Sequence, residues 1–279
     1  MIKILVDSSS DYSLEEVKQN NLELVPLYVT FGDTTYADKL TLTQDDFYQM
    51  LLSSAEFPKT SQPSPEDFLN LFEKAKENDD ELICILLSSG LSGTYQNANL
   101  AKNLVGYEKI HIIDSRCATA GIRILADHGQ KLIREGLSAK EITAQLEQLK
   151  LRIKIAAGLD TLEYLRRGGR IGRAAAFVGE LARLKPLLML GSDGAIDTIG
   201  KCLGKNKAIS QLLRFLETNK PDPNYPLYTI YTCGTENVEK LEQKLGDTGY
   251  AVQGRQQLGS ALGAHLGPNV FGLVYVTAE

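Results

Sequence analysis

The segment KTSQPSP, residues 59–65, places three hydroxyl side chains close together without a neighbour that could activate them. Ser64 precedes a proline and is followed three residues later by Asp67, which predicts that Ser64 caps a helix. Thr60 and Ser61 have no such role, and we expect them at a loop tip before that helix. They are either solvated turn residues or hydrogen-bond donors to a ligand.

A second group of hydroxyls lies in SSGLSGTYQNA, where an apolar strand is expected to end and a helix to begin. In a parallel α/β sheet this edge binds ligands, because free N–H groups at the helix N-terminus favour an anion. The segment lacks the Gly-Lys-Ser/Thr ending of a phosphate loop and the third glycine of a dinucleotide loop, so it supports nucleotide binding only weakly. Ser92 either serves an anion site or caps the helix. The hydroxyls suited to this position are those of Ser88, Ser89, Ser92 and Thr94.

An enzyme alternative also rests on Ser92. The sequence GLSGT resembles the G-x-S-x-G elbow of hydrolases, although Thr94 replaces the glycine that permits the sharp turn. The order Ser92, an acid, then His265 would fit a serine hydrolase or esterase triad. Asp7 resembles the first aspartate of a phosphatase, but Ser9 occupies the second acidic position. We therefore expect Asp7 to accept hydrogen bonds from N–H groups of its own turn.

His265 lies in GSALGAHLGPNVFG, which we expect to form a glycine-rich turn between two strands. Glycine and alanine offer little packing, so the imidazole is expected to face a cleft or solvent. Four arginines lie close together in LEYLRRGGRIGR, and a charge run of this kind is usually a solvated face. Arginine forks also suit phosphate and carboxylate, which makes the segment a candidate docking surface for a phosphate-bearing partner. The four are Arg166, Arg167, Arg170 and Arg173.

The order of the expected elements predicts an α/β fold. Apolar strands at 81–89 and 109–114 alternate with helices, which favours a parallel sheet covered on both faces. A hairpin or pair of strands is expected within residues 22–38. The pattern then changes, since PLLML and AIDTIGK flank a Ser-Asp-Gly turn and predict an antiparallel hairpin. We predict two α/β domains with a cleft between them, at residues 1–150 and 151–279.

The composition limits the classes of function. A net charge of -5 argues against nucleic acid as the main partner. Charged residues interrupt the most apolar segments and the N-terminal apolar run is short, so we expect no membrane span, no signal peptide and a cytoplasmic protein. The cysteines show no CxxC pair and no companion histidines, which favours reduced, buried thiols over a metal site. They are Cys84, Cys117, Cys202 and Cys233.

Six segments in order resemble the DegV family of bacterial fatty acid-binding proteins, the lipid-carrying subunits of fatty acid kinase. The resemblance covers the whole chain and rests on VDSSSD, KTSQPSP, LSSGLSGTYQNA, DSRCATAG, LEYLRRGGRIG and GAHLGPNVFG. It implies a two-domain fold, with an N-terminal Rossmann-like parallel-sheet domain and a second α/β domain containing a mixed or antiparallel sheet. A deep apolar tunnel between them would hold one long-chain fatty acid.

The resemblance also implies roles for particular residues. Thr60, Ser92 and His265 would bind the fatty acid carboxylate, with Ser61 as a helper, and Arg170 would lie near the cleft mouth where the kinase docks. The sequence departs from the family at Asn269, where a glycine is more usual, and this change would alter the loop after His265.

In that reading the chain is a carrier without catalytic activity of its own and without a cofactor or metal. A separate ATP-using kinase phosphorylates the bound acid, and a downstream acyltransferase takes the acyl phosphate into phospholipid synthesis. Unactivated hydroxyls fit this role, because an existing carboxylate needs donors and no nucleophile. The alternatives are the serine hydrolase and a lipid sensor that has the same pocket without a kinase partner.

Overall fold

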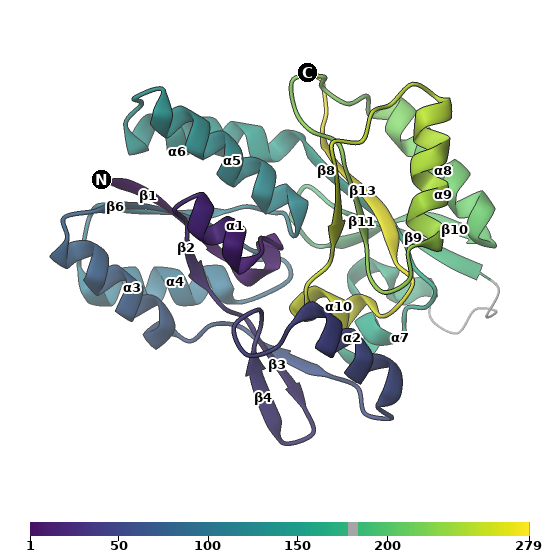
Figure 1. Cartoon of the computed structure of the whole chain (residues 1–279), viewed down its shortest axis with the longest axis horizontal. Coiled ribbons are helices and arrows are strands. Elements are labelled where there is room, and N and C mark those ends of the chain that lie inside the picture. Colours follow the sequence, from purple (N-terminus) through teal and green to yellow (C-terminus); the bar gives the residue numbers. More distant parts are fainter. Residues whose placement is uncertain (178–183, 279) are drawn as a thin grey trace.

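The computed structural model describes residues 1–177 and 184–278 of the chain. It contains a parallel sheet, a mixed sheet and a small antiparallel sheet, with helices packed around them (Figure 1). This arrangement confirms the predicted α/β class, with a parallel sheet in the first half and a mixed sheet in the second.

The parallel sheet has four strands in the order β2-β1-β6-β7. The strands are β1 (Ile2–Asp7), β2 (Glu23–Val25), β6 (Glu81–Leu86) and β7 (Ile110–Asp114). The surrounding helices are η1 (Ser8–Ser10), α1 (Leu14–Gln19), α3 (Pro65–Glu77), α4 (Thr94–Val105), α5 (Ala120–Arg134), α6 (Ala139–Leu149) and η2 (Lys150–Arg152). Neighbouring residues of β1 point to opposite faces, so Leu5 packs with the α3 and α4 side while Ile4 and Val6 pack with α5. Both faces are thus covered, as their apolar strands predict.

The small sheet projects beside the parallel sheet in the order β4-β3-β5 (Figure 1). Its elements are β3 (Tyr28–Phe31), β4 (Thr34–Ala37) and β5 (Lys59–Ser61), with helix α2 (Gln44–Ser53) between the last two strands. The β3–β4 hairpin confirms the expected pair of strands. The expectation of a loop tip for Thr60 and Ser61 was wrong, because their backbone pairs with Val29 and Tyr28 of β3.

The mixed sheet has six strands in the order β10-β9-β8-β13-β11-β12. The strands are β8 (Ile153–Gly158), β9 (Leu184–Leu190), β10 (Ile196–Leu203), β11 (Tyr228–Tyr231), β12 (Gly254–Gln257) and β13 (Phe271–Val276). The helices are α7 (Glu163–Arg167), η3 (Gly172–Phe177), α8 (Lys205–Thr218), α9 (Glu236–Asp247) and α10 (Ser260–Leu266). The antiparallel pairing of β9 with β10 confirms the hairpin predicted around the Ser-Asp-Gly turn.

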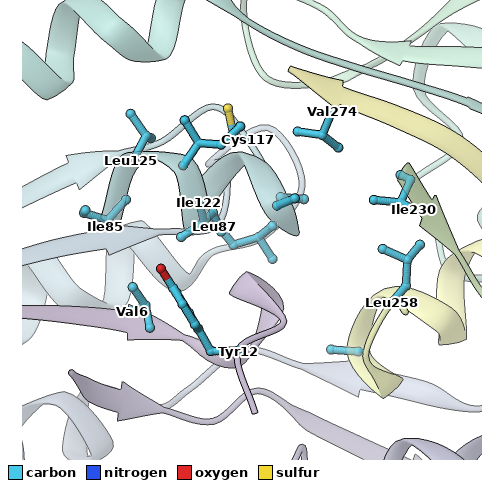
Figure 2. Close-up of a cluster of buried hydrophobic side chains, with 14 of the residues drawn as sticks. Val6, Tyr12, Ile85, Leu87, Cys117, Ile122, Leu125, Ile230, Leu258 and Val274 are labelled. Atoms are coloured by element: carbon cyan, nitrogen blue, oxygen red, sulfur yellow. The ribbon is translucent and has the colours of Figure 1, made fainter. Parts of the chain in front are cut away.

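The two faces of the mixed sheet have different partners. Ala156 and Phe271 lie in a buried cluster with helices α8 and α9. The opposite face belongs to the cluster that also contains the α5 side of the parallel sheet. Figure 2 shows this junction, where Ile230, Leu258 and Val274 lie across from Leu87 and Ile122. The space between the two large sheets is therefore lined by apolar side chains from both halves of the chain.

Two local predictions have clear outcomes. Ser64 is the N-cap of α3, accepting from the Asp67 N–H while the Asp67 carboxylate accepts from Ser64 N at 2.7 Å. His265 was expected in a turn between strands, and this was wrong, because the segment forms helix α10. Glycine and alanine let this short helix pack closely, since a Cβ on Gly263 would lie 2.7 Å from the Phe47 ring. The division into two domains near residue 150 stays a prediction.

In the two described stretches, no helix is long and apolar enough to cross a membrane. The same stretches hold no group of three or more His, Cys, Asp or Glu side chains placed to bind a metal ion.

Candidate functional site

A cavity lies between the first half of the chain and the mixed sheet. Its walls come from strand β5, from segments that follow the parallel strands, from the mixed sheet and from helix α10. It holds about 910 Å³ of space free of protein atoms, including its opening to solvent. Most of its lining is aliphatic, with Leu27, Leu87 and Leu91 on one side and Ile155, Ala157 and Ile230 on the other. Helix α10 forms a further wall with residues at helical spacing. The α10 side contributes Leu258, Ala261, Leu262, His265 and Leu266.

Thr60 and His265 meet at one end of this cavity. The Thr60 hydroxyl lies 2.7 Å from Nε2 of His265, although 205 positions separate the two residues. Strand β5 positions the threonine and the last turn of α10 positions the histidine. Both side chains line the cavity, as does Ser61, which is itself exposed on β5. The structure thus brings together three of the four predicted carboxylate-binding residues.

The imidazole of His265 is neutral at physiological pH. Burial, together with the positive charge of Arg170, lowers the pKa of His265 to about 4. A neutral ring carries one donor and one acceptor nitrogen. Within the described part of the chain, Nδ1 is buried and has no hydrogen-bond partner. The ring is therefore positioned through Nε2 and by packing, and none of the described carboxylates bonds to Nδ1.

Two glycines make room for the residues around His265. A Cβ on Gly168 would lie 2.1 Å from Nδ1 of His265, so the backbone after α7 packs directly on the imidazole. Gly267 has a φ of +73° and a Cβ there would lie 2.3 Å from the Tyr164 ring. Gly168 of the RGG segment and Gly267 of the GPN segment are thus required by close approach, which the sequence pattern alone did not reveal.

Ser92, the fourth predicted carboxylate-binding residue, also lines the cavity and lies just before α4. Gly93 is the N-cap residue of α4, so Ser92 does not cap the helix in the usual way. Its hydroxyl lies 2.9 Å from that of Thr94. The side chain of Gln62 accepts a hydrogen bond from Gly93 N at 3.0 Å and joins this helix end to the Thr60 segment. Gln62 belongs to the site, although sequence reasoning passed over it.

Arg170 places a positive charge beside these polar groups. It lines the cavity, and its guanidinium donates to the carbonyls of Leu91 at 3.1 Å and Gly168 at 2.7 Å. These two bonds tie the α4 end to the segment that packs on His265. The polar side chains at this end of the cavity are Thr60, Ser61, Gln62, Ser92, Arg170 and His265.

The other three arginines of the predicted docking surface are placed differently. Arg166 and Arg167 both pair with Glu163 on α7, at 2.8 Å and 2.5 Å. Arg173 pairs with Asp193 at 2.5 Å and with Asp197 at 3.0 Å. All three are exposed and neutralised locally, whereas Arg170 faces the cavity. Their role in docking stays a prediction.

The remaining hydroxyls of the strand-end cluster have structural partners. Ser88 donates to the Gly194 carbonyl at 2.8 Å, and Ser89 donates to Asp114 at 2.5 Å. Asp7 accepts from Ser9 N at 3.0 Å, as predicted, and also from Leu87 N at 2.6 Å. These bonds fix the strand ends that surround the cavity.

Buried carboxylates hold the beginning of α10. Asp11 accepts from Gly259 N at 2.8 Å, and Asp38 accepts from the hydroxyl of Ser260. Burial raises the pKa of Asp11 to about 6, an effect that Lys39 partly opposes. These bonds join the first half of the chain to the helix that carries His265.

Asn269, where a glycine was expected, fits the loop after α10. Its φ of +61° lies in the left-handed region, which asparagine tolerates better than most residues. Its side chain donates to Asp160 at 3.0 Å and so ties the loop to the segment after β8. The imidazole stays in the cavity wall.

Fold and site together define a class of protein, an α/β protein in which a mostly apolar cavity has several polar side chains close together in its wall. The DegV family model, described as an uncharacterised protein family, matches residues 1–278, so this chain belongs to the DegV family. A DegV domain-containing protein of Caldanaerobacter subterraneus subsp. tengcongensis is 32% identical over 276 residues, or 98% of each chain.

Solved structures of DegV family and fatty acid-binding proteins are similar to this chain over nearly its whole length. A DegV family protein from Thermus thermophilus, described for its fatty acid binding, has 31% identity, 99% coverage of each chain and a TM-score of 0.89. A stearic acid-binding protein from Eubacterium ventriosum has 29% identity, covers 99% of this chain and 98% of its own, and has a TM-score of 0.89. DegV of Bacillus subtilis, described as a fatty acid-binding protein, has 28% identity, 99% coverage of each and a TM-score of 0.86.

Proposed function

We propose that this protein binds one long-chain fatty acid in the cavity and presents its carboxylate to a separate ATP-using fatty acid kinase. The kinase transfers the γ-phosphoryl group of ATP to a carboxylate oxygen and releases ADP. The carrier then passes the acyl phosphate to an acyltransferase of phospholipid synthesis. In this proposal the chain is cytoplasmic and has no catalytic activity of its own.

The observation that carries the proposal is the Thr60–His265 pair at the polar end of a mostly aliphatic cavity. A carboxylate at this end can accept hydrogen bonds from the Thr60 and Ser92 hydroxyls. Charge-assisted hydrogen bonds of this type are stronger than those between neutral groups. The fatty acid binding described for the relatives supports the same ligand class.

The aliphatic wall supplies most of the binding free energy. Burial of apolar surface contributes about 0.8 kcal/mol per CH₂ group. A chain of a dozen or more carbons therefore gains enough to offset the cost of ordering it in the cavity. The few polar groups set the position of the carboxylate.

Arg170 supports the kinase step. It stands on the cavity wall between the α4 end and Gly168, where a phosphoryl donor approaching the carboxylate would meet it. Guanidinium groups suit phosphate oxygens. Arg166, Arg167 and Arg173 can extend the kinase-docking surface if their ion pairs with Glu163, Asp193 and Asp197 break when the kinase binds.

The geometry favours the carrier over a serine hydrolase. The partner of His265 Nε2 is Thr60, and the Ser92 hydroxyl pairs with Thr94. A triad histidine needs an acid on its second nitrogen, whereas Nδ1 of His265 is unpartnered in the ranges that the structure covers. The pKa near 4 also makes this ring a weak base.

A reconstitution experiment tests the kinase half of the proposal. The protein is loaded with labelled fatty acid and incubated with ATP and a candidate kinase from its host. Formation of hydroxylamine-sensitive acyl phosphate is the expected result. Failure with every candidate kinase, while the lipid stays bound, would overturn the kinase step and favour the sensor alternative.

A further inference from the structure

Thr119 is a polar side chain placed away from the carboxylate-binding end of the cavity. It lines the cavity and is only 2% exposed. Its hydroxyl lies against the Asp11 carboxylate and lowers that group's pKa. In the chain as described, however, the Thr119 hydroxyl makes no hydrogen bond of adequate geometry. A buried hydroxyl without a partner carries a desolvation cost that a ligand group could remove.

The backbone at Thr119 is strained as well. Its φ of +49° is unfavourable for a β-branched residue, and a hydrogen bond from Thr119 N to Ser9 O, 2.8 Å long, helps to hold it. Strain of this kind persists only where the surroundings impose it. The backbone that carries the Thr119 side chain is therefore held in place at the cavity wall.

Helix α10 gives the distance between Thr119 and the carboxylate-binding end of the cavity. Asp11, which the Thr119 hydroxyl touches, binds Gly259 N at the start of α10, whereas His265 lies in its last turn. Six residues of helix span about 9 Å. A zigzag chain advances about 1.2 Å per bond, as an extended backbone does, so this depth corresponds to roughly seven or eight carbon–carbon bonds. An acyl chain that runs along α10 from a carboxylate at His265 would therefore have its middle beside Thr119.

This position presents one hydroxyl group, that of Thr119, and the Asp11 carboxylate lies next to it. Oδ2 of Asp11 is also buried and has no partner among the described residues. Thr119 can donate to Asp11 after a small rotation and accept a hydrogen bond from a hydroxyl on the ligand. A methylene group in the same place offers no donor, so the Thr119 oxygen then has no group from which to accept a hydrogen bond.

We propose that Thr119 forms a second polar subsite in the cavity, which selects acyl chains carrying a hydroxyl group near carbon 9. The ligand class is the mid-chain hydroxy fatty acids, bound with their carboxylate at Thr60 and His265. This inference rests on the proposed function, since it uses the same cavity and the same orientation of the chain.

The test compares octadecanoic acid with its 5-, 9- and 14-hydroxy derivatives in competition binding to the full-length protein. A hydroxyl buried against aliphatic side chains costs roughly ten- to a hundredfold in affinity. We expect the 5- and 14-hydroxy acids to bind that much more weakly than octadecanoic acid. The 9-hydroxy acid should bind within threefold of octadecanoic acid or more tightly.

Substitutions then connect the preference to one hydroxyl. Thr119→Val keeps the branched shape and should weaken only the 9-hydroxy acid, by roughly tenfold or more, while Thr119→Ser should retain the preference. Thr143→Val is the matched control, because Thr143 also has a buried hydroxyl without a partner in the described chain but lies on α6, away from the cavity. It should change none of the four affinities.

The outcomes separate this inference from the proposed function. Equal affinities for the three hydroxy acids, or equal loss of all ligands in Thr119→Val, would overturn the subsite and leave fatty acid binding intact. If Thr119→Val does not fold, loss of the preference in Thr119→Ser overturns the subsite. No binding of octadecanoic acid to the wild-type protein would overturn the proposed function, and the subsite with it.

Discussion

Gly168 and His265 are in direct contact, and the backbone of the glycine lies where any larger residue would displace the imidazole. A Cβ at position 168 would stand 2.1 Å from Nδ1 of His265. The segment between α7 and η3 therefore positions the ring from outside the cavity, while Thr60 holds Nε2 from within it.

Gly168→Ala should weaken fatty acid binding about tenfold or more, because the ring must move away from Thr60 and lose a hydrogen bond. Binding by isothermal titration measures this. Gly246→Ala on α9 is the control, since nothing lies within 4 Å of its Cβ. Alanine there should leave binding unchanged and raise the free energy of unfolding by up to about 1 kcal/mol. Equal affinities in the Gly168→Ala and wild-type proteins would show that the contact does not position the ring.

Thr60→Val and Ser92→Ala should each reduce fatty acid affinity roughly ten- to a hundredfold, since a buried carboxylate then lacks a donor. Ser64→Ala, in the same segment as Thr60, removes a helix cap and should cost about 1 kcal/mol of stability without changing affinity. Lipid occupancy after purification and denaturant midpoints provide the two readouts. Full occupancy in both site variants would refute the carboxylate assignment.

Arg170→Ala should keep the bound lipid and slow its phosphorylation at least tenfold, because the cationic group at the cavity end is lost. Arg173→Ala is the comparison, since its charge is already paired with Asp193 and Asp197. Acyl phosphate formation at fixed kinase concentration gives the rates. A loss of lipid from Arg170→Ala that fully accounts for the lower rate would assign this arginine to binding alone.

The pKa of His265 should rise from about 4 when the cavity receives a carboxylate, because the negative charge stabilises the imidazolium. In the ligand-free protein the lowered pKa means that the contribution of His265 to stability is present above about 6.5 and lost as the pH falls towards 4. NMR titration of the ring with and without fatty acid measures both states. An equal or lower pKa in the complex would place the carboxylate elsewhere.

Ser260→Ala should lower the free energy of unfolding by about 1 to 3 kcal/mol, because Asp38 is buried and would lose its hydroxyl donor. Fatty acid affinity should fall as well, since Ser260 begins the helix that carries His265. Chemical denaturation and lipid binding on the same samples test both effects. Ser210→Ala on the exposed face of α8 should alter neither quantity. A stable Ser260→Ala variant with normal binding would remove this contact from the account.

The sequence predicted the architecture better than the placement of single side chains. Apolar strands and capping residues such as Ser64 depend on neighbours in sequence, so their periodicity was informative. His265 was misplaced because a glycine-rich segment gives a weak helix signal, and α10 forms through packing against α2. Thr60 contacts His265 although 205 positions separate them, and the pattern of neighbouring residues in the sequence does not predict such a contact. Thr60 and Ser92 were candidates from their hydroxyls and positions in the sequence, and the family resemblance assigned them to a carboxylate, whereas Thr119 and Gln62 required the cavity itself.

Native mass spectrometry of the purified protein tests the central claim most directly. Protein isolated without added lipid should carry one long-chain fatty acid, held noncovalently and released on denaturation, with lower occupancy in Thr60→Val. A purified protein that carries no lipid and does not bind added fatty acid would contradict the account. A fatty acid ester on Ser92 that the protein itself hydrolyses would contradict it as well, and would identify a hydrolase.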